Sequence, residues 1–113
     1  MPRINFIELP TRDLHATQAF YEKVFGMAMT AFGPTYACTL TGDVDLGLQA
    51  DAAEATKAPL PVILVEDLEA TLAAVTATGA TITVPIFAFH GGRRFHFADP
   101  SGNELAAMQA SEG

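Results

Sequence analysis

The chain has 113 residues, enough for one small domain with a hydrophobic core of its own. Its formal net charge of −7 argues against a nucleic-acid partner, which usually requires a basic face, and its apolar runs are too short to span a bilayer. The chain does not open with a basic segment followed by an apolar one, and its single cysteine, Cys38, suits a reducing compartment. We therefore expect a cytoplasmic protein with neither a membrane nor a nucleic-acid partner.

The segment around Asp13 occurs twice. Residues 12–19 (RDLHATQA) return as residues 66–73 (EDLEATLA), so that Asp, Leu, Ala, Thr and Ala recur 54 positions later. A repeat of about 50 residues indicates two copies of one supersecondary unit, neither of which can bury its apolar face alone. The sequence thus predicts one domain, residues 1–113, built from a first module at 3–50 and a second module at 58–109.

The first module is expected to begin with a strand over residues 4–11. Asp13 is suited to cap a helix, because its carboxylate can accept hydrogen bonds from the free amides of the first turn. Apolar residues at helical spacing carry that helix to Gly26, which can adopt the left-handed conformation that closes a helix. Three short strands separated by Gly-Pro and Gly-Asp turns should follow, over residues 27–32, 36–40 and 44–49.

The second module repeats this order. A strand is predicted over residues 60–65, and Asp67 should cap a helix that ends at Gly79. Three strands should again follow, over residues 81–88, 94–98 and 104–108. Each module is therefore βαβββ, and the predicted fold class is α+β.

Three motifs resemble those of the vicinal oxygen chelate superfamily, which includes glyoxalase I, bleomycin-resistance proteins and extradiol dioxygenases. They are FYEKVFG at residues 20–26, VEDL at 65–68 and FADPSGN at 97–103. The resemblance covers nearly the whole chain. It implies two βαβββ modules that form a curved mixed sheet around a cavity, but it does not fix the activity, because this fold hosts many chemistries.

Metal-using members of the superfamily carry ligands on the first and last strands of each module. The resemblance puts the matching positions at Phe6, Leu60 and Ala106, with Gly47 or Gln49 as the fourth. Phe, Leu and Ala have no lone pair to offer a divalent cation, and a neutral Gln is a poor substitute for a carboxylate. We therefore expect no metal and no other cofactor, which disfavours metal-dependent glyoxalase I or dioxygenase chemistry.

The three histidines do not restore a metal site by their spacing. His15 lies near a predicted helix start and is expected in solvent, and His90 lies in a predicted loop. A pair formed by His90 and His96 would still need a third ligand.

Strand alternation selects the side chains that should face the expected cavity. Apolar residues at alternate positions should pack under the helices, which leaves a few polar groups and an apolar lining on the other face. The predicted ligand-binding residues are Phe6, Glu8, Tyr36, Gln49, Leu60, Arg94, His96 and Met108. A few placed polar groups in an apolar cavity are typical of a small-molecule site.

Glu8 has the most specific chemistry among these residues. A carboxylate on an otherwise apolar strand is costly to bury unless it is paired or protonated. Glu8 can form a structural ion pair with Arg94 or His96, it can bind a ligand, or it can act with His96 in proton transfer next to a carbonyl. The sequence leaves these three roles open.

Two functions fit these observations. The first is a metal-independent small-molecule-binding protein of the glyoxalase/bleomycin-resistance type, which sequesters an aromatic or amphipathic molecule. The alternative is a metal-independent lyase, isomerase or epimerase with Glu8 and His96 as catalytic residues, so whether the chain is an enzyme stays open. Sheet edges and apolar helix faces further predict a homodimer.

Overall fold

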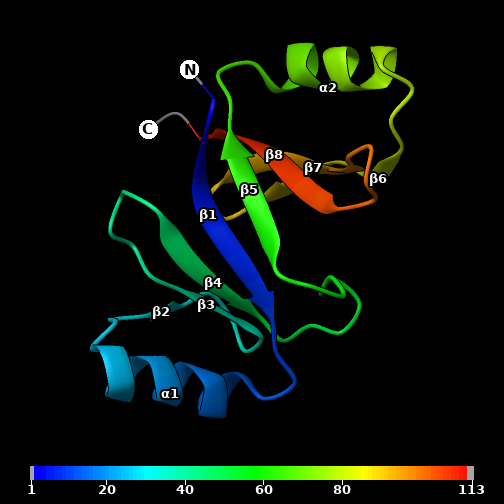
Figure 1. Cartoon of the computed structure of the whole chain (residues 1–113). Coiled ribbons are helices and arrows are strands. Elements are labelled where there is room, and N and C mark those ends of the chain that lie inside the picture. The colour runs from blue at the N-terminus through cyan, green and yellow to red at the C-terminus, as the bar shows by residue number, and fades with distance from the viewer. Residues whose placement is uncertain (1, 112–113) are drawn as a thin grey trace. The chain divides into compact units, whose positions relative to one another are not determined.

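The structure, a computed structural model, describes residues 2–111 (Figure 1). The chain divides into two compact units. We call Phe6–Leu60 the first module, and we call the described residues before Phe6 and after Leu60 the second module. Each module is described by itself below.

The first module holds one helix and the strands around it. Its elements are β1 (Arg3–Pro10, which begins just before the module), α1 (Leu14–Phe25), β2 (Thr30–Ala31), β3 (Tyr36–Cys38) and β4 (Asp45–Gln49). The strand order is β2-β3-β4-β1. β1 pairs with β4 in parallel, with Glu8 opposite Gly47, whereas the pairs of β4 with β3 and of β3 with β2 are antiparallel.

The second module has the same order of elements. They are β5 (Leu60–Leu64), α2 (Leu68–Ala77), β6 (Ile82–Phe89), β7 (Gly92–Ala98) and β8 (Glu104–Ala110), with the strand order β5-β8-β7-β6. β5 and β8 are parallel, and the other two pairs are antiparallel. The predicted α+β class with two βαβββ modules is thus confirmed, and the strands of each module include both parallel and antiparallel pairs.

Both helices begin at the predicted aspartates. The side chain of Asp13 accepts a hydrogen bond from the Ala16 amide at 3.0 Å, and that of Asp67 accepts one from the Ala70 amide, also at 3.0 Å. These bonds satisfy amides that have no partner within the helix. The duplicated sequence therefore produces the same cap twice.

The helix ends differ between the modules. Gly26 closes α1 in the left-handed conformation, with φ of 68°, as predicted. The helix α2 ends at Ala77, and Gly79 follows the C-cap Thr78 in the left-handed conformation, with φ of 84°, as predicted. Here the hydroxyl of Thr78 also donates to the Val75 carbonyl at 2.6 Å.

The strand predicted over residues 27–32 is shorter in the structure, where β2 covers only Thr30–Ala31. The Met27 amide bonds to the Tyr21 carbonyl at 3.4 Å, so the residues just after Gly26 complete the helix end instead of pairing with a strand. Two strands of the second module are instead longer than predicted at one end, since β7 begins at Gly92 and β8 continues to Ala110.

Each helix lies along strands of its own module, α1 on β3 and β4 and α2 on β7 and β8 (Figure 1). In the second module, Leu68 of α2 is fully buried against Phe95, and Phe97 packs at the edge of that core. Because side chains alternate along a strand, Arg94 and His96 lie on the face of β7 opposite to the helix.

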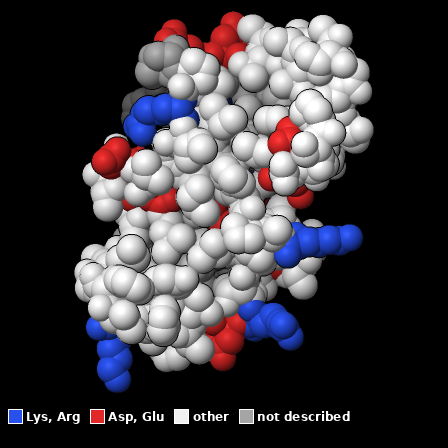
Figure 2. All heavy atoms as spheres, viewed as in Figure 1, with Lys and Arg blue, Asp and Glu red and all other residues white. Residues whose placement is uncertain are grey.

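The helix of the first module is less covered. No residue of α1 is buried, and Phe20, Val24 and Phe25 are exposed. Figure 2 shows a face of the molecule on which uncharged side chains predominate. No helix within residues 2–111 is long and apolar enough to cross a membrane.

Candidate functional site

Glu8 is held in a buried cluster in the first module. Its side chain is 1% exposed, and its Oε1 accepts a hydrogen bond from the Tyr36 hydroxyl at 2.9 Å. Glu8 belongs to β1 and Tyr36 to β3, and β4 runs between them with Gly47 opposite Glu8. A Cβ at Gly47 would come within 2.5 Å of the Tyr36 hydroxyl and 2.6 Å of the Phe6 ring. We call Phe6, Glu8, Tyr36 and Gly47 the Glu8 cluster.

Gln49 lies beside this cluster, since its Cα pairs with that of Tyr36. Its side chain is buried, and its Oε1 accepts a hydrogen bond from the Asp51 amide at 2.9 Å. The carboxamide oxygen of Gln49 therefore already forms a hydrogen bond with the backbone of the segment that follows β4. A ligand-binding role for Gln49 stays a prediction.

The second module buries two basic side chains, Arg94 at 4% exposure and His96 at 3% exposure. The guanidinium carbon of Arg94 lies 5.1 Å from the ring centroid of Phe87 and 4.9 Å from that of Phe89. Both distances are within the range of cation–π attraction. The ring of His96 lies 5.8 Å from that of Phe87, so the same aromatic side chain contacts both residues.

Glu104 orients His96. Its Oε2 lies 3.2 Å from His96 Nδ1 and also accepts a hydrogen bond from the Thr83 hydroxyl at 2.8 Å. A carboxylate on one ring nitrogen fixes the orientation and the tautomer of an imidazole. We call Phe87, Phe89, Arg94, His96 and Glu104 the Arg94 cluster.

The remaining predicted lining residues, Leu60 and Met108, are also buried. Met108 pairs with Arg94 across β7 and β8, and its Sδ accepts a weak hydrogen bond from Asn5 Nδ2 at 3.6 Å. The other polar atom of this carboxamide, Asn5 Oδ1, is buried and accepts no hydrogen bond from the described residues. Asn5 is thus a further polar group at the edge of the second module.

The positions that correspond to metal ligands do not fit a divalent cation. Leu60 and Ala106 are fully buried apolar residues, and the space above Gly47 is filled by the Phe6 ring and the Tyr36 hydroxyl. Within residues 2–111, no three His, Cys, Asp or Glu side chains come close enough to hold a metal ion. These positions therefore lack the oxygen and nitrogen ligands that such a site needs.

Three further residues have side chains that could react. The His90 ring lies 5.3 Å from that of Phe89, and Cys38 is the cross-strand partner of Gly47. His15 and His90 are exposed, as the sequence predicts for positions at a helix start and in a loop. Cys38 is buried, and burial, reinforced by the nearby Asp45 carboxylate, raises the pKa of its thiol to about 11. A thiol with this pKa is a poor nucleophile at neutral pH.

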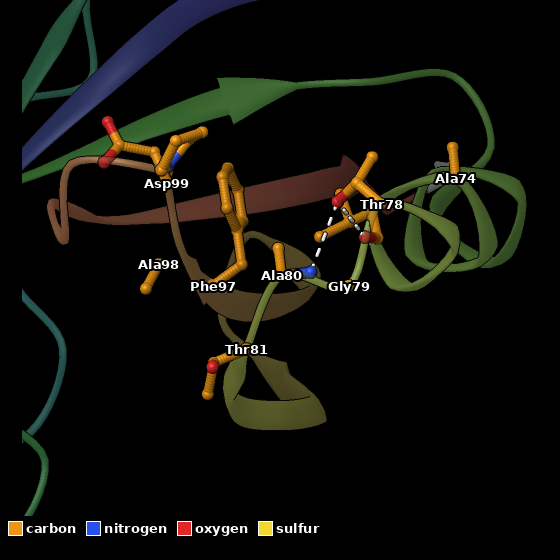
Figure 3. A pocket seen from close by; sticks show the side chains of 10 residues that line it. Ala74, Thr78, Gly79, Ala80, Thr81, Phe97, Ala98 and Asp99 are labelled. Carbon is orange, nitrogen blue, oxygen red and sulfur yellow. Dashed lines mark hydrogen bonds between the residues drawn. The ribbon is translucent and has the colours of Figure 1, made fainter.

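A cleft of about 630 Å³ opens elsewhere in the second module, between the end of α2 and the end of β7 (Figure 3). The ring of Phe97 lies between Thr78 and Asp99 in this view. The hydroxyl of Thr78 bonds to backbone atoms of Val75 and Ala80, and the Asp99 carboxylate accepts from Ser101 and Asn103. Because these polar groups serve the local fold, we take each of the two buried clusters as a candidate site of its own module instead.

The structure brings together Glu8 with Tyr36 and Phe6 in the first module, and Arg94 with His96 and Met108 in the second. Sequence reasoning missed Asn5, Phe87, Phe89 and Glu104. The sequence contained a signal for two of these residues. Glu104 lies on the same strand face as Ala106 and Met108, because side chains alternate along a strand. Asn5 lies within a predicted strand, where asparagine is unusual.

Comparisons with solved structures find the same fold. The chain is similar to methylmalonyl-CoA epimerase from Mycobacterium tuberculosis, with a TM-score of 0.76 and 14% identity over 96% of this chain and 88% of the other. It is also similar to the Mn(II)-bound glyoxalase from Novosphingobium aromaticivorans, with a TM-score of 0.70 and 18% identity over 96% of this chain and 40% of the other.

A third similar structure is a superfamily member from Vibrio splendidus, with a TM-score of 0.69 and 18% identity over 98% of this chain and 100% of the other. A comparison with curated protein sequences finds no match. A sequence profile of the Glyoxalase/Bleomycin resistance protein/Dioxygenase superfamily matches residues 3–107. Since that match covers most of the chain, the protein belongs to this superfamily.

Proposed function

We propose that this protein binds a small molecule without a metal ion, in the manner of the bleomycin-resistance branch of its superfamily. One observation carries the proposal: the strands that would supply metal ligands carry Phe6, Leu60 and Ala106 at those positions, yet Glu8 remains buried on the first of them. Burying a carboxylate is costly without hydrogen bonds, and here Tyr36 supplies one. Polar groups kept in an apolar setting are typical of ligand recognition.

Elemental analysis and thermal unfolding with a metabolite panel test this proposal. We expect no stoichiometric zinc, nickel, iron or manganese after dialysis, and no change of melting temperature with a chelator. At least one small molecule should raise the melting temperature in a dose-dependent manner, because a ligand that binds only the native state stabilises it by mass action. One equivalent of metal that survives dialysis, or a chelator-dependent fall in melting temperature, would refute the metal-free site.

A metal-independent lyase, isomerase or epimerase is the second candidate. The observation in its favour is that both candidate catalytic residues are oriented, Glu8 by the Tyr36 hydroxyl and His96 by Glu104. In an epimerase, a base takes the proton from a carbon next to a carbonyl, the electron pair forms an enolate, and an acid returns a proton to the other face. The similarity to methylmalonyl-CoA epimerase concerns the fold and supports this candidate only by analogy.

Solvent deuterium exchange distinguishes the two candidates. If the protein is an epimerase of this kind, methylmalonyl-CoA should acquire deuterium at C2 in heavy water, as followed by NMR. Glu8→Gln should then abolish exchange while the protein stays folded, because Gln keeps the shape of the side chain but cannot take the proton. If wild-type protein accelerates no exchange, this candidate is rejected for that substrate and the binding function stands.

A further inference from the structure

We propose that exposed aromatic side chains at the end of α1 in one copy of the protein insert into the cleft between α2 and β7 of a second copy. This interaction is separate from the small-molecule binding proposed above, because it uses neither the Glu8 cluster nor the Arg94 cluster. Its basis is the internal duplication, which puts the two complementary surfaces at equivalent positions of the two modules.

The 54-residue repeat allows α1 and α2 to be compared position by position. The large apolar residues at the end of α1 correspond to small residues in the second module: Phe20 to Ala74, Val24 to Thr78 and Phe25 to Gly79. The two helices therefore begin with the same cap, but they end with opposite shapes. The first module carries large side chains where the second module has space.

The end of α1 projects from the first module. Phe20, Val24 and Phe25 are 53%, 56% and 62% exposed. The rings of Phe20 and Phe25 lie 6.3 Å apart in an edge-to-face arrangement, so they present one surface. We call Phe20, Val24 and Phe25 the apolar end of α1. Exposed apolar side chains that are grouped in this way typically mark a contact with another molecule.

The cleft of the second module has the size and the lining that these side chains need. Its volume is about 630 Å³, and its walls include the ring of Phe97 and the side chains of Ala74, Ala80 and Ala98 (Figure 3). The small residues Ala74 and Gly79 keep this space open. A phenyl ring that enters it can pack against Phe97, and aromatic pairs attract each other beyond the effect of the buried area.

The charges beside the two surfaces are complementary. Lys23 lies in the last turn of α1 and is exposed. Asp99 is the charged residue among those that line the cleft. Hydrogen bonds, above all that from the Asn103 side chain, lower the pKa of Asp99, so its carboxylate is charged at neutral pH. An ammonium group on the apolar end of α1 therefore suits this cleft better than a carboxylate would.

A second copy of the chain accounts for both surfaces. Each copy carries one apolar end and one cleft, so a two-fold axis between two copies forms the contact twice. Two phenylalanines and a valine that are about half exposed bring roughly 300 Å² of surface to one contact. Two contacts, counted on both partners, then bury roughly 1,200 Å², the lower end of specific interfaces. A small molecule in the cleft would leave the apolar end of α1 uncovered.

Sedimentation velocity of single variants tests the two surfaces. Wild type should be a dimer at micromolar concentration. Phe25→Ser removes a ring and Ala74→Trp fills the cleft, and each should raise the dissociation constant of the dimer at least tenfold. Ala73→Trp is the matched control, since Ala73 is an exposed residue of α2 that does not line the cleft, and it should leave the dimer unchanged.

Two further variants support this series. If Ala74→Trp does not fold, as judged by circular dichroism, Thr81→Phe replaces it, because Thr81 is exposed and lines another wall of the same cleft. Lys23→Glu should raise the dissociation constant several-fold, since it brings a second negative charge towards Asp99. An equal affinity of Lys23→Glu and wild type would contradict the proposed orientation of α1.

A double-mutant cycle shows whether the ring and the cleft contact each other. Phe25→Ser should weaken the dimer much less in the Ala74→Trp background than in wild type, because the ring then has no cleft to enter. In an equimolar mixture of the two single variants, one of the two contacts pairs an intact ring with an open cleft. The mixture should therefore dimerise more tightly than either variant alone.

Three results would overturn the inference. The first is a wild-type protein that stays monomeric at these concentrations. The second is a dimer that is weakened by Phe25→Ser but not by filling of the cleft, because the apolar end of α1 would then contact another part of the second copy. The third is binding of indole to the cleft, lost in Ala74→Trp, in a protein whose association does not respond to Phe25→Ser.

Discussion

The Tyr36 hydroxyl donates a hydrogen bond to Glu8 across an intervening strand. The two residues belong to β3 and β1, and the bond of 2.9 Å passes over Gly47 of β4. This arrangement exists because Gly47 has no side chain: a Cβ there would lie 2.5 Å from the phenolic oxygen. The orientation of the buried carboxylate thus depends on a residue that contributes no functional group of its own.

Removal of the phenolic hydroxyl should destabilise the protein. Tyr36→Phe leaves Glu8 Oε1 without one of its donors, at a cost of about 1–3 kcal/mol in the free energy of unfolding. Denaturant titrations at pH 7 measure the effect. In the double variant with Glu8→Gln, the loss caused by Tyr36→Phe should be smaller, because a neutral acceptor is less costly to leave unsatisfied. If the losses in the free energy of unfolding from the two single substitutions add up to the loss in the double variant, the hydrogen bond contributes nothing to stability.

Gly47→Ala should disturb the hydrogen bond between Tyr36 and Glu8, because the new methyl group would lie against the Tyr36 hydroxyl. The new methyl group would press on Tyr36 and on the Phe6 ring, and overpacking of this kind typically costs about 1–3 kcal/mol. Combining it with Tyr36→Phe should recover part of the loss, because the hydroxyl makes the shortest of these contacts. Chemical denaturation of the single and double variants tests this coupling, and a Gly47→Ala protein as stable as wild type would contradict it.

Asp45 should make stability depend on acid pH. Burial disfavours its charged form, but hydrogen bonds from the Thr39 hydroxyl, from the Thr41 amide and hydroxyl, and from the Gly42 amide outweigh this effect and lower the pKa of the carboxyl. A lowered pKa in the folded state adds stability that is present above the unfolded value of about 3.9 and disappears as the pH falls through the folded value.

Asp45→Asn should therefore lower the free energy of unfolding by about 0.5–1.5 kcal/mol at pH 7, since most of its hydrogen bonds lie near solvent. The difference from wild type should shrink progressively below about pH 4. Urea titrations over this pH range give the comparison. Asp51→Asn is the control, since the Asp51 carboxylate accepts one hydrogen bond among the described residues, from the Ala53 amide, and should show a smaller effect. A difference that is independent of pH would exclude the charged network as its cause.

Cys38 should be unreactive in the native protein. With a thiol pKa of about 11, only about one thousandth of the side chain is thiolate at pH 8, and the residue is buried. An aromatic disulfide reagent should modify one thiol per chain rapidly in guanidinium chloride and at least a hundredfold more slowly in buffer. Rapid native labelling would mean that β3 opens easily.

The protein should form a homodimer through apolar surface of the first module. Phe20, Val24 and Phe25 of α1 are exposed, and such side chains usually find a partner. Sedimentation at micromolar concentration should show a dimer. Val24→Glu should shift it towards monomer, whereas Ala73→Glu, on an exposed position of α2, should not. A wild-type monomer would contradict this expectation.

The local elements were predictable because their signals are local. Asp13 and Asp67 cap the helices through side chains that act within three residues, and the duplication shows that the second module repeats the first. Both predicted closing glycines, Gly26 and Gly79, adopt the left-handed conformation, because the positive φ that follows a helix favours glycine. For the site, alternation along β1 predicted that Glu8 is buried, and alternation along β7 predicted the same for Arg94 and His96. The two aromatic rings next to Arg94 belong to the neighbouring strand β6, and a pattern within one strand does not reveal a contact between strands.

Gly47 also limits how this site can change. A carboxylate introduced at position 47 would meet the Phe6 ring and the Tyr36 hydroxyl, so it fits only if both side chains become smaller. A smaller residue at position 36 would in turn remove the donor to Glu8. A single substitution at position 36 or 47 that makes room for a metal ligand should therefore give a less stable protein. Attempts to convert this scaffold should change positions 6, 36 and 47 together.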